Sequence, residues 1–396
     1  MVVWLVNPFD NLPHEGARLQ RYPLLADAFA AAGHETVLWS AAFSHALKKP
    51  RVPPPPDGAG RGWRLELLPV PPYRTNVSLR RFASHRAFGA EFLRAGLSCG
   101  RRPDLIVASA PPLSSAAAAI ALRDRFGCKA VIDVQDAWPE TFERLLPLPG
   151  GALRRAAARA AFAPLFRKAR AVYRAADGIA AVSRRYFGIA AAAGSKAPFH
   201  LARLAMDIGP RPARRPRDPS APLRVAYAGN MGRTYDLATA IAAVKSLPGA
   251  ELELAGAGPC EARLRRLAAG CPRIVFRGYL GADALADMLA RADAGLVPMF
   301  PDAYVGVPGK FSDYAAAGLP IVDSLPGEAA ELLERHGAGF RYRAGSESSL
   351  RAALCAAAAM APEALAAAGE RARDMAEAEF SAKTVYPRFV EFAAGL

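Results

Sequence analysis

The chain has 396 residues, more than one hydrophobic core usually supports, and its hydrophobic content of 52% is enough for two domains. No apolar run reaches the roughly 18 residues of a membrane-spanning helix, and five cysteines without C-x-x-C spacing argue against a metal cage or a disulfide framework and for a reducing cytoplasm. The positive charge is concentrated in the residues up to and including Asp218, where 33 Lys and Arg stand against 16 Asp and Glu, so we expect the first half to meet an anionic surface.

Short apolar strands alternate with helical patterns along the first half. The opening MVVWLVNPFD lacks a basic segment before its apolar run, so we interpret it as a first strand and not as a signal peptide. Such alternation is typical of βαβ units with right-handed crossovers, which predicts a doubly wound parallel sheet. The predicted strands are 2–6, 36–39, 65–70, 105–108, 130–134 and 178–182, and the predicted helices are 22–31, 79–97, 114–126 and 152–175.

The segment 207–224 is rich in Pro and Arg, has no periodicity, and is predicted to link two domains. The alternation then restarts, with strands 225–228, 251–255, 274–277, 295–297 and 320–322 and helices 237–246, 260–269 and 282–291. We therefore expect an α/β fold with two Rossmann-like, doubly wound parallel-sheet domains, 1–206 and 225–378, that face a cleft. A last helix, 379–396, is expected to pack back toward the first domain.

Loops beyond the carboxyl ends of strands are the candidate sites, because ligands of open α/β sheets bind there. Three such loops in the second half carry glycine, which lets the backbone approach a ligand closely, and one adds a guanidinium suited to phosphate oxygens. The alternative for each glycine is an ordinary strand-to-helix turn. The residues concerned are Gly229, Asn230, Gly232, Arg233, Gly256, Gly278, Tyr279 and Leu280.

A fourth candidate is the stretch VPGKFSDY, in which Pro308 and Gly309 predict a turn before a short helix. The start of this helix offers N–H groups to an anion, with Lys310 beside them. Asp313 is expected in the first turn, where the helix dipole would stabilise its carboxylate. The sharper alternative is that Asp313 accepts hydrogen bonds from the paired hydroxyls of a ribose.

Two loops of the first half also combine suitable groups. The loop after the first strand has a glycine before a basic helix start, with the candidates His14, Glu15, Gly16 and Arg18. The stretch VIDVQDAWPETF places Asp133, Asp136 and Glu140 near Trp138. Carboxylates beside an exposed Trp suit a sugar, because acids bond hydroxyls and the ring stacks on apolar sugar faces. The alternative is a capped turn with a core Trp.

The chain resembles the family 4 retaining glycosyltransferases of the GT-B type over nearly its whole length. The resemblance is carried by LLADAFAAAGHETVLW, DVQDAWPE, ADGIAAVS, AYAGNMGR, ELAGAGP, ADAGLVP and KFSDYAAAGLPIV. The segments ASAPPL, DVQDAWPE and YAGNMG are most similar to a bacterial branch that builds capsule, O-antigen and exopolysaccharide and that includes fucosamine-transferase-like members.

The resemblance implies that Asp313 holds the ribose of a nucleoside-diphosphate sugar, and that Arg233 and Lys310 hold its diphosphate. Val305 replaces the first glutamate of the family's E-x7-E motif, which leaves the donor sugar open. We assign Arg233, Lys310 and Asp136 to catalysis. The assigned donor-binding residues are Gly16, Gly229, Asn230, Gly232, Gly256, Gly278, Tyr279, Leu280, Pro308, Gly309 and Asp313, and the assigned acceptor-binding residues are His14, Glu15, Arg18, Trp138 and Glu140.

The implied activity is retaining sugar transfer without a cofactor or metal, from a UDP-sugar rather than a GDP-sugar. The acceptor would be a saccharide or a polyprenyl-diphosphate-linked saccharide. The segment 154–174 mixes cations with apolar residues, as basic helices on anionic membranes do, so we expect a peripheral enzyme on the cytoplasmic face of the membrane. The alternative is a helix packed on the sheet with a charged outer face.

Three other functions remain possible from the sequence. A GT-B-fold nucleotide-sugar 2-epimerase would use the donor alone, and a catalytically dead scaffold is suggested by Val305. The pI of 10.0 suggests nucleic-acid binding, but no nucleic-acid-binding module is found, so no nucleic-acid partner is expected.

Overall fold

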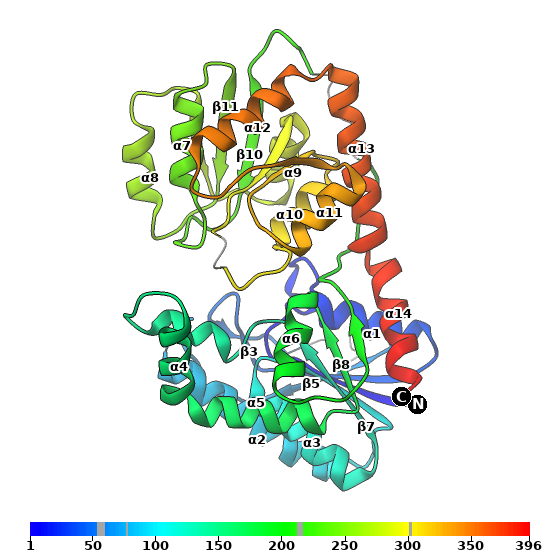
Figure 1. The fold of residues 1–396 in the computed structure, drawn as a ribbon. Coiled ribbons are helices and arrows are strands. Elements are labelled where there is room, and N and C mark those ends of the chain that lie inside the picture. Colours follow the sequence, from blue (N-terminus) through cyan, green and yellow to red (C-terminus); the bar gives the residue numbers. More distant parts are fainter. Residues whose placement is uncertain (54–59, 77, 212–216, 301–302) are drawn as a thin grey trace. The chain divides into compact units, whose positions relative to one another are not determined.

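The computed structural model describes residues 1–53, 60–76, 78–211, 217–300 and 303–396. The chain divides into two compact units (Figure 1): Met1–Asp207 with Ala382–Leu396 form the first, and Ile208–Ser381 the second. Residues 212–216 of the predicted linker lie outside the described residues.

A seven-stranded parallel sheet forms the centre of the first unit. The strand order is β5-β2-β1-β6-β7-β8-β9. The chain adds strands on one side of β1 and then, from β6 on, on the other side, which is the doubly wound Rossmann arrangement. The strands are β1 (Val2–Val6), β2 (Glu35–Ala41), β5 (Arg64–Leu68), β6 (Leu105–Ala110), β7 (Lys129–Val134), β8 (Gly178–Ala181) and β9 (Phe199–Leu201), and a separate antiparallel pair is formed by β3 (Phe43–Ser44) and β4 (Lys49–Pro50).

Successive β1 side chains point to opposite sides of the sheet, and both sets are apolar. Helices therefore cover both faces of this sheet. Val3 and Leu5 pack with α1 and α14 in one cluster, whereas Trp4 packs edge-on against Phe92 of α2 on the other face. The helices of the unit are η1 (Pro13–Glu15), α1 (Arg21–Ala31), α2 (Leu79–Ser98), α3 (Leu113–Phe126), η3 (Glu140–Leu145), α4 (Ala152–Ala161), α5 (Ala163–Ala175), α6 (Arg184–Ala192) and α14 (Ala382–Ala394).

The second unit repeats the plan with six parallel strands in the order β12-β11-β10-β13-β14-β15. These are β10 (Leu223–Ala228), β11 (Ala250–Ala255), β12 (Ile274–Gly278), β13 (Ala294–Val297), β14 (Ile321–Asp323) and β15 (Gly339–Arg341). One face packs on α7 (Leu237–Lys245), α8 (Glu261–Ala268) and α12 (Glu347–Ala359), and the other on α9 (Ala282–Arg291), α10 (Gly309–Ala316), α11 (Glu328–His336) and α13 (Pro362–Glu379).

The expectation of two Rossmann-like parallel-sheet domains is confirmed. The single predicted helix 152–175 is wrong, because the chain leaves helical geometry at Phe162 and α5 restarts with Pro164 in its first turn. The three-residue strands β9 and β15 have no expected counterpart in the sequence pattern.

No single helix in the described residues has both the length and the apolar composition to cross a membrane. The pair α12 and α13 meets those criteria only when its two members are taken together, and they bend by 112° at the break.

Candidate active site

Three loops at the carboxyl ends of β10, β11 and β12 are held together by backbone hydrogen bonds. The Gly229 N–H donates to the Ala255 carbonyl over 3.0 Å, and the Gly256 N–H donates to the Gly278 carbonyl over 2.6 Å. The Met231 N–H adds a bond of 2.9 Å to the Ala257 carbonyl. The sequence-predicted glycines Gly229, Gly256 and Gly278 therefore lie in one cluster at the edge of the sheet.

Glycine is required at position 256 for two reasons. Its φ of +118° lies in a region that L side chains rarely adopt. A Cβ at Gly256 would lie 2.0 Å from the Gly229 carbonyl oxygen, which leaves no room for any side chain. Gly258 is also close to its neighbours, since a Cβ there would lie 2.5 Å from Asn230 Oδ1.

The helix α10 brings Lys310 to these loops. The Tyr314 hydroxyl accepts a hydrogen bond of 2.7 Å from the Ala228 N–H, and a Cβ at Gly295 would lie 2.4 Å from the Tyr314 ring, so the helix lies close against the sheet. The start of α10 then faces the β10 loop. Lys310 Nζ lies 3.5 Å from the position that a Cβ at Gly229 would occupy.

Lys310 is a buried cation without an anionic partner. It is 9% exposed, and its Nζ lies 3.8 Å from the ring centroid of Tyr235 and 5.3 Å from that of Tyr227. It forms no salt bridge with any residue that the structure describes. Burial lowers the pKa of the Lys310 ammonium to about 8, and the charge of Asp313 acts in the opposite direction. The group is therefore cationic at neutral pH and poised for an anion.

Asp313 does not lie where the sequence pattern places it. The helix begins at Gly309 with Pro308 as its N-cap, so Lys310 occupies the first turn and Asp313 follows in the second. The expected stabilisation of Asp313 by the first turn is therefore wrong. The positive end of the helix dipole disfavours a cation in the first turn. The dipole and the Lys310 ammonium both attract an anion, so their effects add at this end of α10. The ribose role of Asp313 stays a prediction.

Arg233 lies in the exposed turn between β10 and α7. It has no hydrogen bond or ion pair within the described part of the chain, so its guanidinium is available to a ligand. Gly232 precedes it and accepts a hydrogen bond of 3.2 Å from the Tyr235 N–H. The turn is thus tied to the ring that contacts Lys310.

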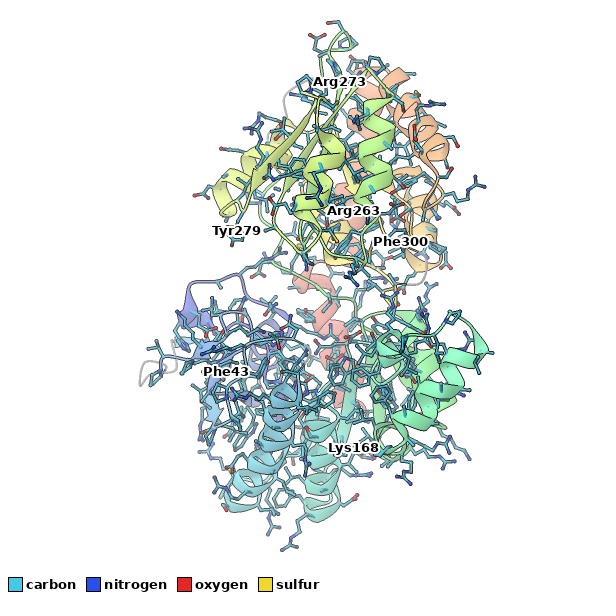
Figure 2. The ribbon with its side chains drawn as sticks, turned by 90° about the vertical axis from the view of Figure 1, so that its left-hand side faces the viewer. Phe43, Lys168, Arg263, Arg273, Tyr279 and Phe300 are labelled. Carbon is cyan, nitrogen blue, oxygen red and sulfur yellow. The ribbon has the colours of Figure 1, made fainter. Side chains whose placement is uncertain are left out.

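The two predicted donor-binding residues after Gly278 differ in exposure: Tyr279 is exposed and Leu280 is partly buried. Tyr279 follows β12 and is 87% exposed, and Figure 2 shows its side chain at the edge of the unit. Leu280 packs against the hydrophobic cluster that contains α10. Val305, which replaces the family glutamate, packs against the same cluster, so an apolar residue there serves the core of the unit.

In the first unit, Asp133 is fully engaged in the core. The Arg21 guanidinium donates to both carboxylate oxygens of Asp133 over 2.8 Å and also to the carbonyls of Ala202 and Arg203. Both side chains of the pair are almost completely buried. The expectation that Asp133 offers a carboxylate to a sugar is wrong, because bidentate pairing already satisfies it.

The expectation of an exposed Trp138 is also wrong. Trp138 is 8% exposed, and its ring packs 4.6 Å from that of Phe142. The Arg81 guanidinium lies between the rings of Trp138 and Phe9, at 5.5 and 5.6 Å from their centroids. His85, 5.5 Å from Trp138, completes this cluster, and burial lowers its pKa to about 3.

Arg81 and His85 are absent from the sequence-predicted set. Both lie on α2, a helix that carries no loop glycine, strand end or recognised motif, so nothing in the local sequence marked them. Their placement follows from the packing of α2 beside the loop after β7. Arg81 also attracts Asp136, whose Oδ1 accepts a hydrogen bond of 2.8 Å from the Ala137 N–H, while burial raises the pKa of Asp136.

The side chains of the loop after β1 bond within the loop and to residues of other segments. Glu15 accepts a hydrogen bond of 2.8 Å from the Leu12 N–H and pairs with Arg51 at 2.6 Å. His14 Nε2 lies 3.1 Å from the Val52 carbonyl, and Arg18 donates to Met206 Sδ at 2.5 Å. Gly16 ends the short helix η1 with a φ of +66° and open space around it. The donor and acceptor roles assigned to this loop stay predictions.

Among the described residues, no group of three or more His, Cys, Asp or Glu side chains could hold a metal ion.

Two family models match the chain. Residues 222–360 match "Glycosyl transferases group 1", and residues 20–201 match "Glycosyl transferase 4-like domain". Together the two matched segments cover most of the sequence. The comparison with curated proteins gave no match.

Solved structures with the same fold span the whole chain. Sucrose-phosphate synthase from Thermosynechococcus elongatus superposes with a TM-score of 0.75 at 16% identity, covering 100% of this chain and 98% of that one. Anabaena HepE, in complex with UDP and glucose, gives 0.67 at 15% identity with full coverage of both chains. WaaG, a glycosyltransferase involved in lipopolysaccharide biosynthesis, gives 0.63 at 15% identity, also with full coverage of both. The chain therefore belongs to the family 4 glycosyltransferases and has the GT-B fold.

Proposed function

We propose that this glycosyltransferase is a retaining enzyme that transfers a sugar from a nucleoside-diphosphate donor, UDP rather than GDP, to a saccharide or lipid-linked acceptor. The role would be the synthesis of a bacterial surface polysaccharide. UDP is the nucleotide in the Anabaena HepE complexes, and lipopolysaccharide biosynthesis is the role named for WaaG, so both neighbours support the proposal without deciding it.

The observation that carries the proposal is the unpaired ammonium of Lys310 beside the Gly229 loop. The departing nucleoside diphosphate gains negative charge as the bond to the sugar breaks. A buried cation and fixed backbone amides stabilise that charge without reorganising, which is usually the largest single catalytic contribution. Arg233 would add a second, solvent-exposed cation to the same diphosphate.

Retention would follow from displacement on one face of the sugar. The acceptor oxygen attacks the anomeric carbon as the bond to the diphosphate breaks, and the departing phosphate oxygen takes the acceptor's proton. Asp136 would lie near the transferred sugar. This step needs no metal, cofactor or covalent enzyme intermediate.

A ligand panel followed by thermal unfolding tests the donor. A ligand that binds the native state raises the melting temperature, so UDP should raise it more than GDP or ADP at equal concentration. A shift equal for all three nucleotides would remove the preference for UDP, and no shift with any of them would contradict donor binding.

Product analysis tests the reaction. With a UDP-sugar and an oligosaccharide acceptor, nuclear magnetic resonance should show an unchanged anomeric configuration and equal turnover with EDTA present. Conversion of the donor sugar without any acceptor would instead identify a 2-epimerase.

The cytoplasmic, membrane-peripheral location is part of the same proposal. The helices α4 and α5 carry exposed cations such as Arg155 and Lys168, and Leu153 is 72% exposed beside them. Flotation with vesicles that contain anionic lipid should recover the protein, and neutralising Arg155 and Lys168 should reduce recovery. Equal recovery with neutral vesicles would contradict this location.

A further inference from the structure

The first unit contains a cavity of about 290 Å³ whose lining includes one of the predicted acceptor-binding residues, Glu140. It is bounded by η3, α4, α5 and α6. The lining includes Glu140 from η3, Arg159 from α4, Phe166, Arg170 and Tyr173 from α5, and Ile189 from α6. Its volume is close to the lower end of the range for small-molecule sites, which suits one monosaccharide unit.

Two polar atoms in this lining have no hydrogen-bond partner among the residues that the structure describes. One is the hydroxyl of Tyr173, a residue that is 1% exposed. The other is the buried Glu140 Oε2. Buried polar groups are nearly always paired, and an unpaired one is costly, so two in the wall of one cavity indicate a ligand that supplies the missing bonds.

The same cavity has a cationic wall. Arg159, Arg167 and Arg170 line it, and their side chains are exposed. None of the three forms a hydrogen bond or ion pair with other residues in the described ranges of the chain. Free guanidinium groups bind carboxylates and phosphates in a forked geometry.

We propose that this cavity binds a sugar unit that carries a negatively charged substituent, as part of the acceptor. The sugar hydroxyls would bond Glu140 Oε2 and the Tyr173 hydroxyl, and the anionic group would meet the arginines. An acyl chain would leave the buried carboxylate unpaired, so the lining favours a sugar over a lipid tail. The inference rests on the proposed function, because it names the class of acceptor that the enzyme uses.

Ligand-detected nuclear magnetic resonance on the full chain tests the site directly. The probes are methyl β-glucuronide, glucose 6-phosphate and the neutral methyl β-glucoside, measured with UDP present in excess. At least one anionic probe should bind about tenfold more tightly than the glucoside, as one charge-assisted hydrogen bond would provide. The glucuronide and the phosphate distinguish a carboxylate from a phosphate substituent.

Three variants locate the binding. Arg159→Gln with Arg170→Gln should abolish the preference for the anionic probe, and Tyr173→Phe should weaken all sugars several-fold. Lys168→Gln is the matched control, because Lys168 is an exposed cation of α5 that is not part of the described lining (Figure 2). Circular dichroism and melting temperature confirm that each variant folds.

Equal affinity for anionic and neutral sugars would overturn the inference, as would an equal loss of binding in Lys168→Gln. Absence of all sugar binding would also overturn it. UDP binding, measured separately by calorimetry, keeps the two proposals distinguishable, since it fails only if the donor function is wrong.

Discussion

Arg21 and Lys310 are both buried cations in the first turn of a helix, and the difference between them separates structure from function. Arg21, at the start of α1, has four hydrogen bonds to Asp133 and two backbone carbonyls. Lys310, near the start of α10, has two aromatic neighbours and no salt bridge within the described ranges of the chain. In the first unit, groups of the chain itself therefore bind the Arg21 guanidinium. In the second unit, the Lys310 ammonium remains available to bind a ligand.

The largest effect, on the free energy of unfolding, is expected from breaking the Arg21–Asp133 salt bridge. Asp133→Asn leaves the Arg21 guanidinium buried without its counter-charge, which should lower the free energy of unfolding by about 3–5 kcal/mol. Urea denaturation measures this loss. Asp136→Asn is the comparison, since Arg81 attracts the Asp136 carboxylate but no salt bridge joins Asp136 to an arginine among the described residues. A loss below about 1 kcal/mol in Asp133→Asn would mean that the Arg21–Asp133 pair is not structural.

Removing the unsatisfied cation should affect the reaction and spare the fold. Lys310→Gln should lower kcat/KM by about 10²–10³, the usual cost of deleting one stabilising group for a developing anion. The melting temperature should stay the same or rise, because a buried unpaired charge is removed. Arg291→Gln, an exposed cation at the end of α9, should leave turnover unchanged.

The backbone beside Lys310 can be perturbed without changing any charge. Gly256→Ala should lower the free energy of unfolding by about 2–3 kcal/mol and weaken nucleotide binding, because its Cβ would collide with the Gly229 carbonyl. Gly249→Ala is a matched control with no atom within 4 Å of the added Cβ. Equal denaturation midpoints for the two variants would contradict the close approach of the loops.

The exposed cation Arg233 should contribute less than the buried one. Arg233→Gln is expected to reduce turnover by about tenfold, because solvent screens its interaction with the diphosphate. Its melting temperature should equal that of the native protein, since no internal contact is lost. A larger effect in Arg233→Gln than in Lys310→Gln would reverse the assignment of the principal cation.

The smallest effect is a pH dependence of nucleotide affinity. With its pKa lowered to about 8, Lys310 loses its charge as the pH rises from 7 to 8.5, so UDP affinity should fall about fourfold. Lys310→Gln should lack this dependence. The native protein should also gain stability from this group between pH 8 and the ordinary lysine pKa of 10.5, where only the unfolded state retains the proton.

The sequence predicts the sheets well because long apolar strands alternate with helical segments. It misses β3, β4, β9 and β15, because segments of two or three residues rarely show a period, although the equally short β14 was expected. It also misses the break at Phe162, where the helical pattern continues although Pro164 interrupts the hydrogen bonds. At the helix break, Pro164 overrides the local helical propensity. In the short strands, the segments hold too few residues for a pattern to be recognised.

The site is less predictable, because its properties depend on distant contacts. Glycine spacing and strand ends identified the Gly229, Gly256 and Gly278 loops. The partner of Asp133 lies 112 positions away in the sequence, so its structural role is not readable locally. The burial of Trp138 and the place of Lys310, not Asp313, in the first turn likewise emerge only from the packed fold.

The role of Lys310 in donor binding is tested by isothermal titration calorimetry of UDP with the native protein, Lys310→Gln and Arg291→Gln. We expect Lys310→Gln to bind UDP about tenfold more weakly or worse, whereas Arg291→Gln should bind as the native protein does. Equal UDP affinity in all three proteins would contradict the claim that the unpaired ammonium of Lys310 holds the donor's diphosphate.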